Sequence, residues 1–538
     1  MPLPPAPADR RTARRARTRV AGWLRLCCLP LCCLPLWCLP LYTAWALDSG
    51  QRLRVAVPTM PPTLGNPYGA NGTPSSLTWS AIFDGLTRLD PDGQLQPALA
   101  VRWSMETATR WRFELRENVR FSNGERVDAD AVVATIEWLR SPEGQRTVIG
   151  NEIRSVVRAE ARDAGTVLIH TETPDAILPA RLSSVMIVPP RRWAEVGPER
   201  FARAPVGTGP FQLVEWADRG RSARLVAVDD SWRAPRLEEL VLVGLPDSAV
   251  RVQALRSREV DLAVVDIDDT DFLVARGFAI DHAPAMQVMA LAFNTERERP
   301  TPVSDVRVRQ ALNLAIDREA IAGILLQGLA APAGQPASRV THGYAPDIAP
   351  YPYDPERARA LLAEAGYPDG LTLEIQVAEG NMPAASQIYQ VIVQYLARIG
   401  VQARVQVRPF AAWLRDYLAG SVTADLFGLP WNSGPYNDVI RPLEYYSCLK
   451  RRPFFCEPEI VPRIEAANVE TDPVRRLELL RELAADMHAL APSLFVIEQI
   501  DLFARDAGLQ GVQIANRVPM YEYIHWQPAD PARQRISR

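Results

Sequence analysis

The sequence predicts a mixed α/β fold spread over about three domains. At roughly 150 residues per domain, a chain of 538 residues can build several hydrophobic cores. Hydrophobic residues make up 47% of the chain and charged residues 23%, a composition that excludes disorder for most of its length. Residues 371–407 follow the order strand, helix, strand, which is the repeating unit of a parallel sheet.

Strands are predicted where apolar and polar residues alternate, because successive side chains of a strand point to opposite faces. The segment 61–73, rich in Pro, Gly and Asn, reads as the loop after the first strand, and Asn123-Gly124 reads as a turn. The predicted strands are 53–57, 111–115, 371–377, 401–407 and 494–497.

Helices are predicted from capping residues and apolar periodicity. Asp305 is expected to cap a helix that continues to about Gly328, while Asp354-Pro355 begins a helix that Gly366 ends. The other predicted helices are 131–139, opened at Asp128, then 384–399 and 473–490.

The N-terminus has the composition of an export signal. Six arginines precede an apolar run from Val20 to Leu41, and Ala44 and Ala46 supply the small residues that signal peptidase requires. We therefore expect residues 1–46 to be a signal peptide, cleaved near Ala46, of a periplasmic protein. An uncleaved anchor is the alternative, although three prolines interrupt the run. The choice between the general secretory and the twin-arginine route stays open.

Cleavage would leave an acidic chain with 53 basic and 62 acidic residues. Such a surface repels phosphate groups, so we expect no nucleic acid partner. Lys450 is the only lysine, and the five histidines lack metal-site spacing, so we expect neither a metal nor a cofactor. Asp261 and the four aspartates at 266–271 do not match a calcium loop and are expected to form a solvated face.

Six segments between residues 82 and 358 form a joint pattern. They are IFDGLTRL at 82–89, WRFELRENVRF at 111–121, PVGTGPF at 205–211, FNT at 293–295, DVRVRQAL with AIDR at 305–318, and YDPERA at 353–358. In this order they resemble the extracytoplasmic solute-binding proteins of peptide and nickel ABC importers. Most of these segments have a structural role: Gly207-Thr208-Gly209-Pro210, for example, is expected to be a tight crossing whose glycines permit positive φ.

The resemblance implies a two-lobed periplasmic-binding-protein fold with an extra domain, that is, three domains around a closable cleft. It places domain I at 47–77, 209–287 and 505–538, domain II at 78–208, and domain III at 288–504. The implied function is to capture a peptide or peptide-like solute and deliver it to the membrane permease of an ABC importer, without catalysis. We expect a monomer.

The loop 429–438, LPWNSGPYND, is the main candidate for solute binding. Its candidate residues are Trp431, Asn432, Gly434, Tyr436 and Asn437. In the resembling proteins a Trp lies in the cleft at this position. The polar loop also lacks the apolar periodicity that would predict a core position for its aromatic residues. Packing of both rings under a surface turn is the alternative. Binding residues concentrate on loops, so Asn71 and Thr73 of the loop 61–73 are further candidates.

Two charged anchors of the resembling peptide binders are missing. Where they place an Asp for the ligand's ammonium, three residues after the Trp, this chain has Gly434. Where they place an Arg for the ligand's carboxylate, it has residues 378–383, with Glu379 and Asn381 as ligand candidates. We therefore expect unmodified dipeptides to bind poorly and a capped or cyclic solute to bind better.

Several alternatives stay open. Gly434-Pro435-Tyr436-Asn437 is similar to the nickel-binding branch, which favours a nickel chelate, another metallophore or an opine-type solute as the alternative ligand. An exported chaperone or signalling protein on the same fold is a third possibility. An enzyme is not expected, because no GxSxG, phosphate loop or histidine cluster is present.

Cysteine usage predicts a disulfide. Cys448 and Cys456 are the only cysteines after residue 46, and they lie eight residues apart. In an oxidising compartment such an even pair is expected to form a disulfide.

Overall fold

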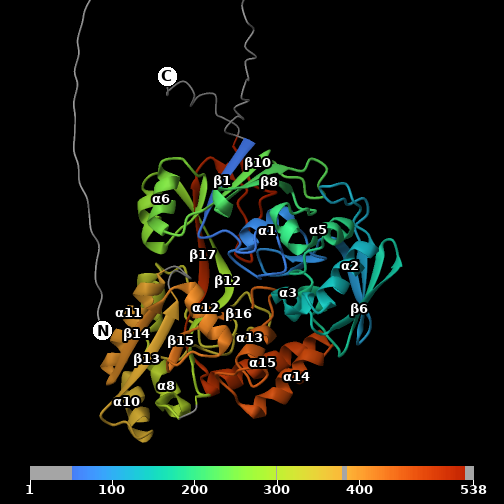
Figure 1. Cartoon of the computed structure of the whole chain (residues 1–538). Coiled ribbons are helices and arrows are strands. Elements are labelled where there is room, and N and C mark those ends of the chain that lie inside the picture. The colour runs from blue at the N-terminus through green and yellow to red at the C-terminus, as the bar shows by residue number, and fades with distance from the viewer. Residues whose placement is uncertain (1–50, 298–299, 379–383, 528–538) are drawn as a thin grey trace, which may run out of the picture. The chain divides into compact units, whose positions relative to one another are not determined.

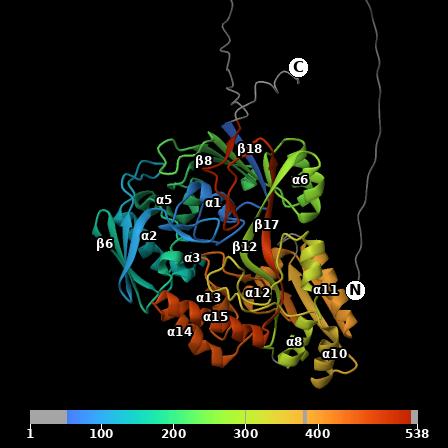
Figure 2. The ribbon, with the colours of Figure 1, turned by 180° about the vertical axis from the view of Figure 1, so that it is seen from behind.

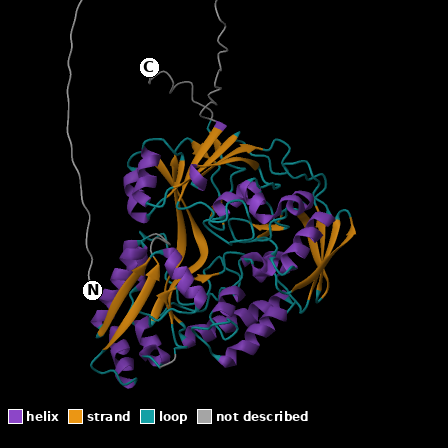
Figure 3. Ribbon diagram, viewed as in Figure 1, coloured by secondary structure: helices purple, strands orange, loops and turns teal. Residues whose placement is uncertain are grey.

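The computed structural model describes residues 51–297, 300–378 and 384–527. The predicted signal peptide, Glu379 and Asn381 lie outside the described residues. These described residues form one compact unit. The fold is a mixed α/β fold, as predicted (Figure 1, Figure 3).

One sheet of eleven strands connects distant parts of the chain. Its order is β14 (Val401–Arg408), β13 (Leu371–Ala378), β15 (Leu426–Gly428), β12 (Phe278–Phe293), β17 (Ser493–Asp506), β11 (Leu262–Val264), β1 (Arg52–Val57), β10 (Glu239–Gly244), β9 (Ser222–Ala227) and β8 (Phe211–Ala217), with β16 (Trp431–Asn432) paired to β12. β13 and β14 are parallel, as the strand, helix, strand order predicts.

The two longest strands, β12 and β17, pair antiparallel along the middle of this sheet. In Figure 1 and Figure 2 both run from the side of β1 and β8 toward the side of β13 and β15. The register shifts between Pro284 and Val288. The predicted domain limits at 287/288 and 504/505 fall inside these two strands. The domain limits stay predictions.

A second, four-stranded antiparallel sheet lies within the range predicted for domain II. Its order is β4 (Ala100–Thr107), β5 (Arg110–Leu115), β7 (Thr166–Thr171) and β6 (Val156–Asp163). Three two-stranded sheets complete the strands: β2 (Thr87–Leu89) with β3 (Leu95–Pro97), β18 (Leu509–Gln510) with β21 (His525–Trp526), and β19 (Ile514–Ala515) with β20 (Val518–Pro519).

The helices begin largely where their caps predict. The side chains of Asp128, Asp305 and Asp354 each accept a hydrogen bond from a first-turn N–H. The α-helices are α1 (Ser76–Ile82), α2 (Ala129–Arg140), α3 (Val148–Glu152), α4 (Leu178–Arg181), α5 (Pro190–Arg203), α6 (Ser248–Arg256), α7 (Thr270–Val274), α8 (Val306–Leu314), α9 (Arg318–Ala320), α10 (Pro355–Glu364), α11 (Ala385–Arg398), α12 (Phe410–Ala419), α13 (Ile440–Tyr445), α14 (Val461–Val469) and α15 (Pro473–Leu490).

The prediction of one helix from 305 to 328 is wrong. α8 ends at Leu314, and a second segment begins after Asp317, which caps α9. The buried guanidinium of Arg318 donates to the carbonyl oxygens of Asn313 and Ile316, at 2.8 and 3.1 Å. A side chain thus contributes hydrogen bonds to carbonyls at and just after the end of α8, where the helix does not continue.

Two further sequence interpretations need correction. Gly207 and Gly209 do not adopt positive φ; a Cβ at either position would lie 1.9 Å or 2.5 Å from a carbonyl oxygen of α1. These glycines are required by close backbone approach instead. Asp261 does not belong to a solvated face, because it is buried and paired with Arg54 at 2.6 Å.

Three clusters of buried apolar side chains form the core. The third is rich in aromatic rings and positions the candidate loop. It includes Trp413, Tyr417, Phe427, Trp431, Tyr436, Tyr446, Phe454, Phe455 and Phe495.

Candidate functional site

The candidate loop 429–438 is fixed to the central strand β12. Trp431 and Asn432 form β16 and pair with Val288 and Gln287. The N–H of Ser433 then donates to the carbonyl oxygen of Met286 at 3.0 Å. The predicted loop therefore starts with a short strand, and its later residues leave β12 at a defined point.

Trp431 is a core residue in this structure. Its side chain is fully buried, its ring stacks on Tyr446 with centroids 3.7 Å apart, and its indole N–H donates to Ser493 Oγ at 3.0 Å. The sequence argument that an aromatic residue on this loop is not core is wrong, because β-pairing turns the ring into the aromatic cluster. A direct contact of Trp431 with a solute stays a prediction.

Tyr436 joins the loop to α4. Arg181 donates to the Tyr436 hydroxyl at 3.0 Å, and its guanidinium lies 4.9 Å from the ring centroid. Burial raises the pKa of Tyr436 well above its ordinary value, against the lowering effect of the Arg181 charge. Because Arg181 also pairs with Asp175 at 3.2 Å, the tyrosine is held by a cation that is itself fixed.

Asn437 and α13 add further contacts to the range predicted for domain II. Asn437 Nδ2 donates to the carbonyl oxygens of Gly93 and Val340, at 2.8 and 2.9 Å. Arg441 pairs with Glu152 at 3.0 Å, and Glu444 pairs with Arg154 at 2.8 Å. These contacts of Asn437, Arg441 and Glu444 thus connect the loop and α13 to residues far from them in the sequence.

Asp438 ends the loop in a buried ion pair with Arg476 of α15. Arg476 donates to both carboxylate oxygens, at 2.7 and 3.0 Å, and both side chains are 3% exposed. Burial acts to raise the pKa of Asp438, but the charge and hydrogen bonds of Arg476 outweigh it and lower that pKa overall. The N–H of Ile440 donates to the same carboxylate at 2.9 Å. Asp438 is therefore occupied and does not face a ligand amine.

Gly434 is surrounded by three neutral amide side chains. A Cβ at this position would lie 3.0 Å from Asn432 Oδ1, 3.2 Å from Asn516 Oδ1 and 3.8 Å from Gln287 Nε2. Asn516 Nδ2 also donates to the Gly434 carbonyl oxygen at 2.5 Å. The immediate surroundings of Gly434 are thus groups that donate and accept hydrogen bonds without carrying charge, and they leave little room for a side chain.

Several buried polar atoms near this junction have no hydrogen-bond partner within the described part of the chain. They are Ser433 Oγ, Asn437 Oδ1 and Asp501 Oδ2. Buried polar groups are normally satisfied, so each such atom is a candidate for contact with a solute or water. Asp501 accepts one hydrogen bond, from Arg517 Nε to Oδ1 at 2.8 Å.

The sequence interpretation missed Gln287, Asp501, Asn516 and Arg517. One signal was available for Asp501, because a charged residue within the apolar run of β17 is unusual. The other three carry no local signal, since they meet the loop only through space.

The remaining predicted residues are not joined to this junction by any hydrogen bond or ion pair within the described part of the chain. Asn71 Nδ2 is buried without a partner, and no hydrogen bond joins Asn71 or Thr73 to the loop among the described residues. Glu379 and Asn381 lie outside the described residues. The roles of these four residues stay predictions.

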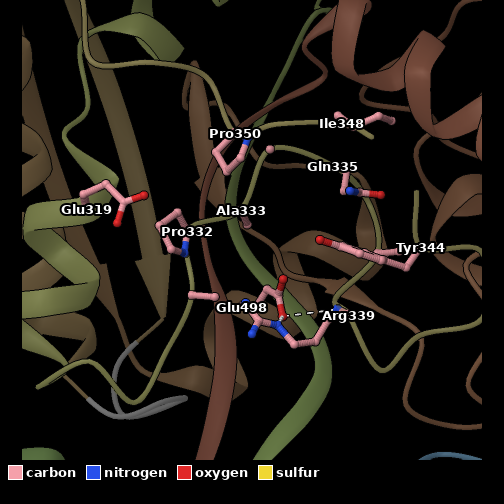
Figure 4. Close-up of a pocket in the computed structure, with 12 residues that line it drawn as sticks. Glu319, Pro332, Ala333, Gln335, Arg339, Tyr344, Ile348, Pro350 and Glu498 are labelled. Carbon is pink, nitrogen blue, oxygen red and sulfur yellow. Dashed lines mark hydrogen bonds and ion pairs between the residues drawn. The ribbon is translucent and has the colours of Figure 1, made fainter. Parts of the chain in front are cut away.

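A pocket of about 230 Å³ lies beside β17, lined mainly by residues 331–350 (Figure 4). Glu498 is 5% exposed and accepts hydrogen bonds from the backbone N–H and Nε of Arg339, at 3.2 and 3.0 Å. Burial raises the pKa of Glu498, while Arg339 acts to lower it. Figure 4 shows the Tyr344 hydroxyl directed toward the same space. The pocket suits a small polar group, and no sequence pattern predicted it.

The predicted disulfide is confirmed: Cys448 and Cys456 are bonded to each other. Among the described residues, no cluster of three or more His, Cys, Asp or Glu side chains is arranged to hold a metal. None of the described helices combines the length and apolarity needed to cross a membrane.

Comparison with known proteins agrees with this architecture. The glutathione-binding protein GsiB of Salmonella paratyphi A is 29% identical over 348 residues, which cover 63% of this chain and 66% of that protein. The match thus spans just under two thirds of the relative. The dipeptide-binding protein of Pseudoalteromonas sp. SM9913, solved with Met-Leu, is 20% identical, with a TM-score of 0.77 over 89% of this chain and 100% of its own.

A further solved structure, AgaA of A. tumefaciens R10 in complex with agropinic acid, is 26% identical, with a TM-score of 0.74, and covers 89% of this chain and 99% of its own. The model of the bacterial extracellular solute-binding proteins, family 5, matches residues 94–449. Because this match takes in well over half of the sequence, the chain belongs to the family 5 bacterial extracellular solute-binding proteins.

Proposed function

We propose that this protein is the solute-binding component of an ABC importer. It captures a peptide or peptide-like solute where the loop 432–437 meets β12, β17 and the turn at Asn516, and delivers it to a membrane permease. The observation that carries the proposal is this junction itself: one loop contacts several distant segments, yet some of its buried polar atoms find no hydrogen-bond partner in the described part of the chain. Membership of a family of solute-binding proteins supports the same assignment.

The domain limits deduced from the resemblance complete the proposal. The two lobes are domain I, at 47–77, 209–287 and 505–538, and domain III, at 288–504. Opening between them would act on β12 and β17, because both strands cross the proposed limits. The contacts of Tyr436, Arg441 and Glu444 with residues 152–181 would then close domain II against domain III.

The chain acts in the periplasm after cleavage near Ala46, as a monomer and without catalysis. The names of its relatives, which are binding proteins, support a binding role. A free binding protein must bind and release its solute unchanged, so incubation with peptides should leave them intact.

The test uses the mature chain, residues 47–538, expressed with its own signal. Native mass spectrometry should show a co-purifying solute of peptide-like mass. Calorimetry with Met-Leu, glutathione and their N-acetylated forms then measures affinity. Deletion of the gene should abolish uptake of the solute that binds. Absence of binding to every peptide, together with unchanged peptide uptake in the deletion strain, contradicts the proposal.

A further inference from the structure

A hairpin near the C-terminus reaches the candidate loop through a strained turn. β19 and β20 are joined by two residues, Asn516 and Arg517, with φ of +47° and +70°. Two-residue hairpins of this kind favour Asn and Gly, and a left-handed Arg is uncommon. Strained residues that persist in a fold are concentrated at functional sites.

Hydrogen bonds of this turn join the candidate loop to the part of β17 that carries Asp501. Asn516 donates to the Gly434 carbonyl oxygen at 2.5 Å, while Arg517 Nε donates to Asp501 Oδ1 at 2.8 Å. Through Arg517 and Asn516, Asp501 is therefore connected to the loop that carries Ser433 and Asn437, whose side-chain oxygens have no hydrogen-bond partner among the described residues.

The ion pair between Asp501 and Arg517 forms only one of its two possible hydrogen bonds. Arginine and carboxylate commonly pair through two parallel hydrogen bonds, but here one N–H meets one oxygen. Oδ2 of Asp501 is buried and accepts no hydrogen bond from the described residues, and the residue as a whole is 8% exposed. A desolvated carboxylate oxygen without a donor carries a free-energy cost that a bound cationic donor would remove.

We propose that Asp501 is the carboxylate that receives the ammonium group of the bound solute, through Oδ2. Arg517 is its positioning residue, because it holds Oδ1 and thereby orients the free oxygen. The inference rests on the proposed function and names the chemistry of its solute: a peptide-like molecule with a free amine. It also revises the sequence expectation that such an amine finds no counter-charge beside Gly434.

The matched control is the pair of Asp281 on β12 and Arg505 on β17, the strand that also carries Asp501. It has the same contact, Arg Nε to one carboxylate oxygen at 2.7 Å, and the Asp281 side chain is 22% exposed against 10% for Asp501. Unlike Asp501, Asp281 has no carboxylate oxygen that is both buried and without a partner. Asp281→Asn therefore removes a charge from the strand pair without removing the proposed contact.

The experiment compares the wild type, Asp501→Asn and Asp281→Asn with two probes: a mixture of free dipeptides and the same mixture after N-acetylation. Each protein is freed of its solute, refolded and checked by urea unfolding. Dipeptides retained on the protein are then identified by mass spectrometry, and their affinities are measured by calorimetry.

We expect N-acetylation to weaken binding to the wild type by about tenfold or more, the effect of losing one hydrogen-bonded ionic contact. Asp501→Asn should lose a similar factor for free dipeptides and bind free and acetylated forms alike, while Asp281→Asn behaves as the wild type. Equal binding of free and acetylated dipeptides by the wild type overturns the inference and leaves the proposed function standing. Binding of neither mixture overturns the proposed function, and the inference with it.

Discussion

Two aspartate–arginine pairs are connected to the candidate loop, and they are built differently. Asp438 and Arg476 share two hydrogen bonds, and the Ile440 N–H adds a third to the carboxylate. Asp501 shares one bond with Arg517, and its other oxygen has no partner among residues 51–297, 300–378 and 384–527. Both aspartates are buried, so burial alone does not separate a structural charge from a functional one. The two differ in how completely their carboxylate oxygens are hydrogen-bonded.

The saturated side of the site includes the aromatic packing around Trp431. Trp431→Ala should lower the free energy of unfolding by about 3–5 kcal/mol, because the indole ring is fully buried and its removal leaves a cavity. Urea unfolding measures this, with Leu418→Ala as a control that should be nearly neutral, since Leu418 is 68% exposed. A variant of unchanged stability that binds solute more than tenfold more weakly would show instead that the ring lines the cleft.

Breaking the saturated ion pair should cost nearly as much. Asp438→Asn leaves the Arg476 charge buried without a counter-charge, so we expect stability to fall by about 3–5 kcal/mol. The folded-state pKa of Asp438 is lowered, so its contribution is present above the ordinary carboxyl pKa and is lost as pH falls through the lowered value. On acidification the wild type should therefore lose the stability that the Asp438 carboxylate contributes, and the variant, which lacks the carboxylate, should not. Equal acid sensitivity of both proteins would contradict the assignment.

The disulfide supports the same side covalently. Phe454, two residues before Cys456, lies with its ring centroid 4.9 Å from that of Tyr446, which stacks on Trp431. Replacing both cysteines by Ser should reduce stability by about 2–3 kcal/mol, as expected for a short closed loop. Thermal unfolding of the variant and the oxidised wild type measures this difference in stability. Under reducing conditions the two proteins should unfold at the same temperature, because the wild type has then lost the disulfide as well.

The smallest effect is expected at the unsatisfied pair. Asp501→Asn keeps an acceptor for Arg517 and removes a carboxylate oxygen that has no partner, so stability without solute should change by less than about 1 kcal/mol. Urea unfolding in the absence of solute gives the measurement. A loss as large as that of Asp438→Asn would mean that Oδ2 is already engaged within the fold, and the comparison between the two pairs would collapse.

The sequence by itself determined the local elements and the family. Capping by Asp128 and Asp354, the limits of the helix 473–490, and the parallel strands around residues 371–407 all follow from residues close together in the chain. Such signals can be read from the sequence because a capping side chain bonds to N–H groups two or three residues away. Apolar periodicity likewise depends only on which residues of one helix or strand share a face. The pairing of Cys448 with Cys456 was predictable for the same reason, since no other cysteine follows residue 46.

Only the tertiary structure decided which residues meet at the site. Trp431 is core because β12 pairs with it, and Asn516 meets Gly434 across 82 residues of sequence. Whether Asp438 or Asp501 keeps a free oxygen depends on arginines that lie 38 and 16 residues away. Local patterns contain no information about such partners, because hydrogen-bond saturation is a property of the folded surroundings and not of the residue.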